Sequence, residues 1–413
     1  MGSKVDQGPF IQDGSSSFTL PDGPRPYLLL LVILPIFAIA PLFYPGIIQT
    51  HDGFVTLWNV TDLRTNLLTP GWVPHIATSF DLLRSQGLLL YYLIAISPFM
   101  PATSLKIVIS ASWVFGGIGV FLWLKSWFGN PGALIAALVY LYLPHQIATV
   151  YVRGAWAETL FFGLLAWAIL VTTYLVTTPK WTLLPIAMAF WGGMGLSQLG
   201  LTLWAALFLV TLLLIVHPRE AKLPVIATIA GVAGVLIFMG LWASTSELHP
   251  TITFTDHFLY PSQLFSAYWG PGISQAGWDD GLSLQLGLAT LGLSLIAVII
   301  WQRHTPSHVE KADRRLIFFL GATLILILLQ FGLSSIIWQI PIAPNARLSD
   351  TLTYPWQLLG LTGLCLAILA GATVWLERRF TQLPLLGAII LLIILSSYHY
   401  LAPQFLSIDK ISL

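Results

Sequence analysis

Two ionisable residues, His51 and Asp52, follow directly after the first long apolar stretch of the chain. Imidazole and carboxylate groups can exchange protons, and they are rare and costly inside a bilayer. When such groups stand at the end of a membrane span, we expect them to face a functional surface. The sequence therefore predicts that any chemistry takes place at one face of a membrane, beside Asp52.

The apolar stretches that must position His51 and Asp52 indicate a membrane protein. Of its 413 residues, 56% are hydrophobic and only 8% are charged, whereas roughly a quarter of the residues in a soluble protein are charged. The net charge of +1 gives no basic surface for a nucleic acid, so no nucleic-acid partner is predicted. The apolar composition predicts that membrane lipids surround the chain. The single cysteine, Cys365, can form no internal disulfide.

The apolar pattern predicts an all-α polytopic membrane protein with about eleven transmembrane helices, following a disordered cytoplasmic tail at 1–26. Residues 27–413 are expected to form one transmembrane domain. The run 181–216 would span roughly 50 Å as one helix against a bilayer core of about 30 Å, so it must fold back. The break is expected among Gly192, Gly193, Gly195, Ser197, Gln198 and Gly200. The predicted spans are 27–48, 105–124, 133–147, 157–176, 182–196, 199–216, 225–243, 282–301, 316–338, 354–376 and 383–400.

The basic residues set the predicted orientation. If the short apolar segment 88–97 does not cross, most Lys and Arg residues fall on one side, which the positive-inside rule assigns to the cytoplasm. We therefore expect a multi-pass membrane protein with a cytoplasmic N-terminus and an outer C-terminus. The outer loops are then 49–104, 244–281 and 339–353. In the first, apolar residues from Phe54 to Leu67 predict an amphipathic helix in the interface.

Four sequence features carry a resemblance to a known family. They are Asp52 soon after the first span, `YVRGAWAE` at 151–158, `GLSQL` at 195–199 and `YPWQLLGL` at 354–361. In this order, over most of the chain, they resemble bacterial membrane proteins of the 6-pyruvoyl-tetrahydropterin-synthase-related family. That family in turn resembles the GT-C superfold of glycosyltransferases, so the resemblance implies a GT-C-like fold.

The resemblance also implies roles for individual residues. In GT-C enzymes an outer-loop carboxylate acts as general base or metal ligand, and arginines hold the phosphate of a polyprenyl-linked sugar donor. Asp52 matches the first role, Arg153 and Arg347 match the second, and Glu158 could orient Arg153. Two simpler interpretations stay open. Asp52 could cap the helix that begins near Phe54, and Arg153 with Glu158 could be a salt bridge that fixes a helix end.

The departures from the family pattern favour a loss of catalysis. Thr56, His75 and the segment 84–87 stand where a His, an Arg-Trp pair and a Gly-Tyr-Gly are expected, and Gln198 replaces a His. The large soluble outer domain of many GT-C enzymes is also missing. The favoured interpretation is an accessory subunit of a larger membrane complex, for example a respiratory or photosynthetic one, packed against other integral membrane subunits. The alternative is an active transferase that uses a polyprenyl-phosphate-linked sugar.

Other chemistries find less support in the sequence. No P-loop, dinucleotide-binding glycine fingerprint, haem attachment or `HExxH` motif is present, so no cofactor is predicted. His51, His75 and His257 could meet on the outer face as metal ligands, but scattered interfacial histidines more often only form hydrogen bonds, and no metal is predicted. A coupled carrier would place charges near mid-membrane, whereas here they lie near the span ends.

Overall fold

The computed structural model describes residues 20, 23–65, 67, 72–73, 80–81, 87–242, 253–303, 310–344, 346–401, 403 and 405–406. Most of the predicted tail lies outside these residues. So do His75, Arg84 and much of the middle of the first outer loop.

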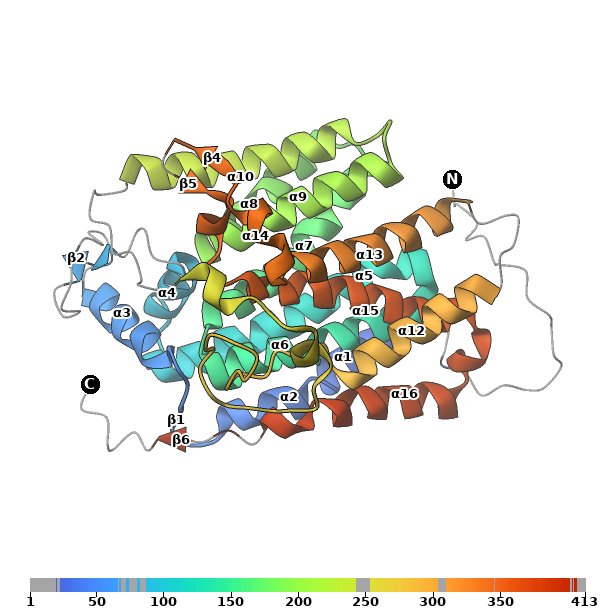
Figure 1. Ribbon diagram of the computed structural model, residues 1–413, viewed down its shortest axis with the longest axis horizontal. Coiled ribbons are helices and arrows are strands. Elements are labelled where there is room, and N and C mark those ends of the chain that lie inside the picture. Colours follow the sequence, from blue (N-terminus) through green and yellow to red (C-terminus); the bar gives the residue numbers. More distant parts are fainter. Residues whose placement is uncertain are drawn as a thin grey trace.

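The described chain is a bundle of helices that run mostly along one long axis (Figure 1). Its helices are α1 (Pro24–Ile33), α2 (Ile36–Ile39), η1 (Ala40–Phe43), α3 (Gly53–Thr65), α4 (Leu88–Ala95), α5 (Pro101–Leu141), α6 (Pro144–Ala148), η3 (Thr149–Arg153), α7 (Trp156–Thr177), η4 (Trp181–Leu183), α8 (Leu184–Ser197), α9 (Leu199–Val216), α10 (Lys222–Trp242), η5 (Phe254–His257), α11 (Pro261–Phe265), α12 (Leu288–Arg303), α13 (Glu310–Leu329), η6 (Gly332–Ser334), α14 (Ser335–Trp338), η7 (Leu348–Thr351), η8 (Pro355–Leu358), α15 (Leu359–Leu376), η9 (Arg378–Thr381), α16 (Leu383–Ser396) and η10 (Tyr398–Leu401).

Strands are confined to three two-stranded antiparallel ribbons in the described residues. They pair β1 (Ile47–Ile48) with β6 (Phe405–Leu406), β2 (Trp72–Val73) with β3 (Phe80–Asp81), and β4 (Pro341–Ala343) with β5 (Ala346–Arg347). The β1–β6 ribbon joins the end of the first span to the end of the last one. The prediction of an all-α polytopic membrane protein is confirmed.

Six helical segments of the described chain are long and apolar enough to cross a membrane by length and composition. They are Pro24–Phe43, Pro101–Arg153, Trp156–Thr177, Leu199–Val216, Lys222–Met239 and Pro355–Leu376. The second contains two of the predicted spans, because Gly129, at φ +70°, interrupts α5 just before Pro131. Each of the eleven predicted stretches is helical in whole or in part.

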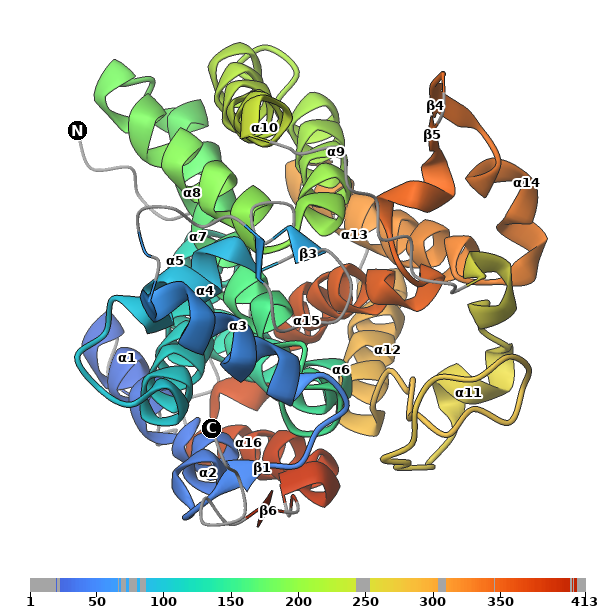
Figure 2. The same cartoon turned by 90° about the vertical axis from the view of Figure 1, so that its left-hand side faces the viewer.

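Helix α15 is the centre of the bundle. All its residues from Leu359 to Val374 are buried, and α5, α12 and α13 pack around it (Figure 2). Glycines allow the close approach: a Cβ on Gly132 of α5 would meet the Gly371 carbonyl of α15, and a Cβ on Gly163 of α7 would meet the Ser112 carbonyl of α5. Small residues at helix contacts are typical of proteins that associate in lipid, where apolar burial gives little driving force.

Several predicted spans have different ends in the structure. The first is broken after α1 because Pro35 has no N–H to continue the helix. Helix α12 begins at Leu288 instead of 282, after Gly287 at φ +88°. Helix α13 ends at Leu329 instead of 338, and the separate turns η6 and α14 follow. The predicted fold-back is confirmed: α8 ends at Ser197 and α9 begins after Gln198.

The predicted outer loops gather at one end of the bundle. In Figure 1, α3 and the β1–β6 ribbon lie at the left, whereas the end of α12, the start of α13 and η9 lie at the right. Helix α4, within the ambiguous segment 88–97, has eight residues and is about 12 Å long, too short to cross a core of about 30 Å.

The predicted interfacial helix is α3, but its apolar side chains do not form one stripe. Leu57 and Leu63 are buried, while Phe54 and Trp58 are exposed on the other side. Arg64 holds α3 against α4, because its Nη2 donates to the carbonyls of Ile94, Ser97 and Phe99 at the end of α4. The helix is therefore fixed to the bundle.

Candidate functional site

The site begins where the segment after β1 crosses the end of η3. The backbone N–H of His51 donates to the Val152 carbonyl at 3.0 Å, and that of Asp52 donates to the Arg153 carbonyl at 2.9 Å. Gly154 follows at φ +69°, and a Cβ there would meet the Thr50 hydroxyl and the Gly53 nitrogen. Only glycine fits this contact without strain, so the turn fixes Asp52 beside Arg153.

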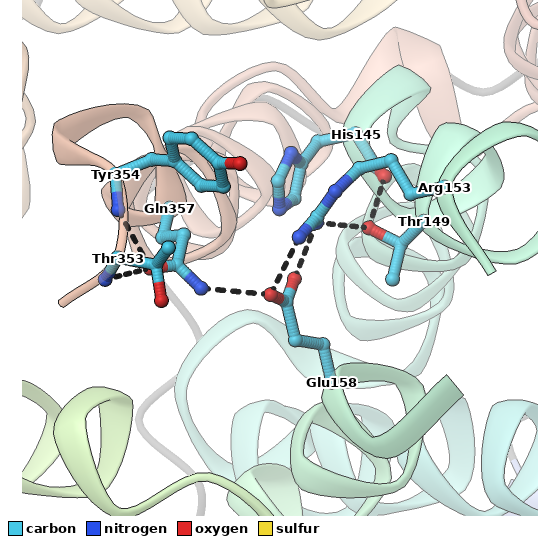
Figure 3. Close-up of polar contacts among 7 residues, drawn as sticks. All are labelled: His145, Thr149, Arg153, Glu158, Thr353, Tyr354 and Gln357. Carbon is cyan, nitrogen blue, oxygen red and sulfur yellow. Dashed lines mark hydrogen bonds and ion pairs between the residues drawn. The ribbon is translucent and has the colours of Figure 1, made fainter. Parts of the chain in front are cut away.

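Below this turn, Arg153 and Glu158 form a buried bidentate ion pair. Arg153 Nη1 lies 2.5 Å from Glu158 Oε2, and Nη2 lies 2.7 Å from Oε1 (Figure 3). Their side chains are only 9% and 2% exposed. A third bond runs from Arg153 Nη1 to the Thr149 hydroxyl at 3.3 Å. The predicted pairing of Arg153 and Glu158 is thus present, and it joins η3 to the start of α7.

Gln357 ties the ion pair to the start of the central helix. Its Nε2 donates to Glu158 Oε1 at 2.9 Å, while its Oε1 accepts from the backbone N–H groups of Thr353 and Tyr354 (Figure 3). The Gln357 side chain thus gives the Glu158 carboxylate a further hydrogen bond and fixes the backbone where η8 begins. This contact joins α7 to η8, the turn that leads into α15, across 199 residues of sequence.

Aromatic rings continue the network toward the segment 253–283, most of which belongs to the second predicted outer loop. The Arg153 guanidinium lies 4.6 Å from the centre of the Trp356 ring, and the Tyr354 ring stacks on Trp356 with their centres 4.6 Å apart. His257 meets Tyr354 edge to face at 4.8 Å. Stacking on Trp suits a desolvated guanidinium, because the ring face is negative. The Arg153 charge is therefore balanced by Glu158 and Trp356 together.

Ser274 connects the segment 253–283 to this aromatic stack. Its hydroxyl donates to Asp280 Oδ2 at 3.0 Å, lies 3.0 Å from His257 Nδ1, and accepts from Trp356 Nε1 at 3.2 Å. Asp280 also accepts from the backbone of Gln275 and Leu282. The Asp280 carboxylate therefore stabilises the turn that joins residues 274–275 to residue 282.

Asp52 presents its carboxylate at the surface of this network. The residue is exposed, and its side chain makes no hydrogen bond among the described residues. The first N–H of α3, from Gly53, is accepted by the Thr50 hydroxyl. Partial burial raises the pKa of Asp52, and the charges of Arg153 and His51 oppose this rise. Burial and the negative charge of Asp52 also raise the pKa of Tyr354, so the two groups share one electrostatic environment.

The structure thus brings three of the four predicted site residues together and leaves one apart. Arg347 is exposed on the β4–β5 ribbon, where its backbone N–H bonds Asp350. The ribbon lies away from α6 and η3 in Figures 1 and 2. Among the described residues, no group of three His, Cys, Asp or Glu side chains could hold a metal. His51 Nε2 instead lies 2.9 Å from the Pro271 carbonyl.

One ionisable member of the network is not predicted by the sequence. His145 is buried beside Arg153 (Figure 3), with its ring 6.4 Å from Trp356, and its Nε2 has no hydrogen-bond partner in the described chain. The only signal in the sequence is a His inside an otherwise apolar run, `YLPHQIA`. For Gln357 and Trp356 the sequence offers only the resemblance of `YPWQLLGL`, because their roles depend on tertiary contacts.

The direction of the Asp52 pKa gives a stability prediction. A carboxyl whose folded pKa is raised binds its proton more tightly when folded, so its ionised form lowers stability above that pKa. We expect Asp52→Asn to fold, and at pH 7 to unfold at the same or a slightly higher temperature than the wild type. The difference should decrease as the pH falls and vanish below the ordinary aspartate pKa of 3.8, where the carboxyl is protonated in both states. Thermal unfolding of both proteins in detergent at pH 7 and at the lower pH measures this difference. A variant that becomes less stable than the wild type as the pH rises would contradict the prediction.

Comparison with known proteins supports the fold. No protein-family model matches the sequence, and no curated protein matches it. Among solved structures, the crystal structure of the oligosaccharyltransferase of Archaeoglobus fulgidus in the apo form is similar, with a TM-score of 0.50 at 10% sequence identity. The similarity covers 92% of this chain but 56% of the archaeal one, so the chain spans just over half the length of that enzyme. The fold of the chain is GT-C-like.

Proposed function

We propose that the chain is an accessory subunit of a larger membrane assembly, descended from a GT-C-like glycosyltransferase of the 6-pyruvoyl-tetrahydropterin-synthase-related type. Lipids surround its apolar helices, and its companions would be other integral membrane subunits. The proposal includes a cytoplasmic N-terminus and an outer C-terminus in a bacterial membrane.

The state of Arg153 carries this proposal. A donor-phosphate site needs guanidinium N–H groups that face the ligand. Here Nη1 and Nη2 both bond Glu158, and the guanidinium plane is covered by Trp356. The second arginine, Arg347, is on a separate ribbon. The two cations predicted to clamp a phosphate do not converge, whereas a helix-fixing salt bridge explains every contact of Arg153.

An active transferase remains the second proposal, and Asp52 favours it. Its carboxylate is exposed, lies in the field of Arg153, and has a raised pKa. These properties suit a general base that takes a proton from an acceptor hydroxyl. The GT-C-like fold also supports an origin in glycosyl transfer. On this proposal the donor would be a polyprenyl-phosphate-linked sugar.

One purification separates the two proposals. We expect the full chain, extracted from its native membrane in mild detergent, to copurify at fixed stoichiometry with other membrane proteins identified by mass spectrometry. The complex should transfer no sugar from a polyprenyl-phosphate donor, and Asp52→Asn should assemble like the wild type because its side chain bonds no other residue of the described chain.

The opposite result would support the enzyme. It consists of a lone protein that transfers sugar, with turnover reduced on the order of a hundredfold or more by Asp52→Asn. Asp52→Asn must still be folded by its thermal transition for that loss to count. Transfer that Asp52→Asn leaves unchanged would exclude Asp52 as the base.

A further inference from the structure

We propose that Arg315 and Trp123 form a binding site for the phosphate of an anionic phospholipid, at the end of the bundle opposite Asp52. Arg315 is in the first turns of α13, and Trp123 is near the end of the first half of α5. Both helices reach the right-hand end in Figure 1. The site is independent of the proposed function.

Two buried hydrogen-bond donors at this place have no acceptor in the part of the chain that the structure describes. Arg315 Nε and Trp123 Nε1 are both buried and make no hydrogen bond in the described chain. Trp123 is only 2% exposed. Buried polar atoms are nearly always paired in native proteins, so two orphan donors in one cluster require a partner.

Both side chains contact the same ring, that of Trp127. The Arg315 guanidinium carbon lies 4.4 Å from the centre of the Trp127 ring, and the Trp123 ring lies 5.3 Å from the same ring. Phe319, one turn after Arg315, contacts both indoles at 6.1 and 6.3 Å. The two donors therefore flank one aromatic cluster between α5 and α13.

The missing partner must be an acceptor, and an anion suits the Arg315 guanidinium best because charge-assisted hydrogen bonds are stronger. Guanidinium and indole N–H groups donate only, and the neighbouring rings of Trp127 and Phe319 offer no acceptor oxygen. Among the described residues Arg315 has no ion pair, whereas Glu377 at the same end lies 3.9 Å from Arg379. Guanidinium groups bind phosphate oxygens with strong, charge-assisted hydrogen bonds.

The position in the bundle assigns that phosphate to a lipid. The cluster lies where membrane-spanning helices end, at the depth where headgroups lie in a bilayer and where Trp is enriched. The side chains of Ile317, Leu324, Ile325 and Leu328 on α13 are exposed and give acyl chains an apolar surface. A net negative headgroup is favoured over a zwitterionic one, because a choline would repel the Arg315 charge.

Native mass spectrometry of the full chain in neutral detergent tests the site. In titrations with phosphatidylglycerol or phosphatidylcholine, we expect one phosphatidylglycerol to bind about tenfold more tightly than phosphatidylcholine. Arg315→Gln should weaken phosphatidylglycerol binding about tenfold. Trp123→Phe, which keeps a ring and removes the N–H, should weaken it about threefold. Arg379→Gln, an exposed arginine of the same end, is the matched control and should bind as the wild type does.

The outcomes separate a lipid headgroup from a free anion. Unchanged phosphatidylglycerol binding by Arg315→Gln, or equal binding of both lipids by the wild type, would overturn the proposal. Displacement of the lipid by inorganic phosphate would assign the site to a free anion and overturn the lipid assignment. If Arg315→Gln does not fold, Arg315→Lys decides: it keeps the charge but not the planar fork, so a loss of about threefold is expected.

Discussion

Replacement of Glu158 by glutamine should lower the free energy of unfolding by about 3 to 5 kcal/mol. The substitution leaves the Arg153 guanidinium buried without a counter-charge, and a buried unpaired charge costs far more than a surface one. The effect is expected to be large because the pair is bidentate and because Gln357 and Trp356 complete its surroundings. Denaturation in mixed detergent micelles measures the change.

The matched control is Glu377→Gln. Glu377 lies 3.9 Å from Arg379, whose side chain is 82% exposed, and exposed pairs contribute about 0 to 1 kcal/mol. A double replacement, Arg153→Met with Glu158→Leu, should recover most of the lost stability, since apolar pairs often replace buried ion pairs at little cost. If Glu158→Gln were as stable as Glu377→Gln, the pair would not hold the fold, and Arg153 would again be available for a ligand.

The sequence predicts the helices because membrane spans need long apolar runs, and it predicts a fold-back within 192–200 because one helix of that length would exceed the bilayer. The structure places the break at Gln198. It does not predict where α13 ends. Trp338 folds back so that its Nε1 bonds the Leu329 carbonyl, and this contact stabilises a break inside an apolar run. Hydropathy carries no information on such a contact.

The sequence predicts the site only where the interacting residues are close together along the chain. Arg153 and Glu158 are five residues apart, and their opposite charges in an apolar context suggest a pair. Gln357 and Trp356 are about 200 residues further on, and only the tertiary fold, which places η8 beside the start of α7, brings them to the pair. Arg347 shows the reverse case: a basic residue on the expected face lies on a separate ribbon, because charge alone does not fix tertiary position.

Replacement of Gly154 by alanine should destabilise the protein by about 2 to 6 kcal/mol. Two costs add: about 1 to 3 kcal/mol for a side chain at positive φ, and about 1 to 3 kcal/mol for a Cβ forced into filled space. The new methyl group would meet the Thr50 hydroxyl and the Gly53 nitrogen. The segment that carries Asp52 would then be pushed from η3, so hydrogen exchange at the Asp52 amide should speed up.

Gly387→Ala in α16 separates this local effect from a general intolerance of added methyl groups. No atom lies within 4 Å of a Cβ at Gly387, so the variant should be unchanged or more stable by about 0.5 to 1 kcal/mol, as alanine favours helix. Adding Thr50→Ala to Gly154→Ala removes one of the clashing atoms and should restore part of the loss, while the cost of positive φ remains. If Gly154→Ala matched Gly387→Ala in stability and in exchange at Asp52, the turn would not position the carboxylate, and Asp52 would be free to move independently of Arg153.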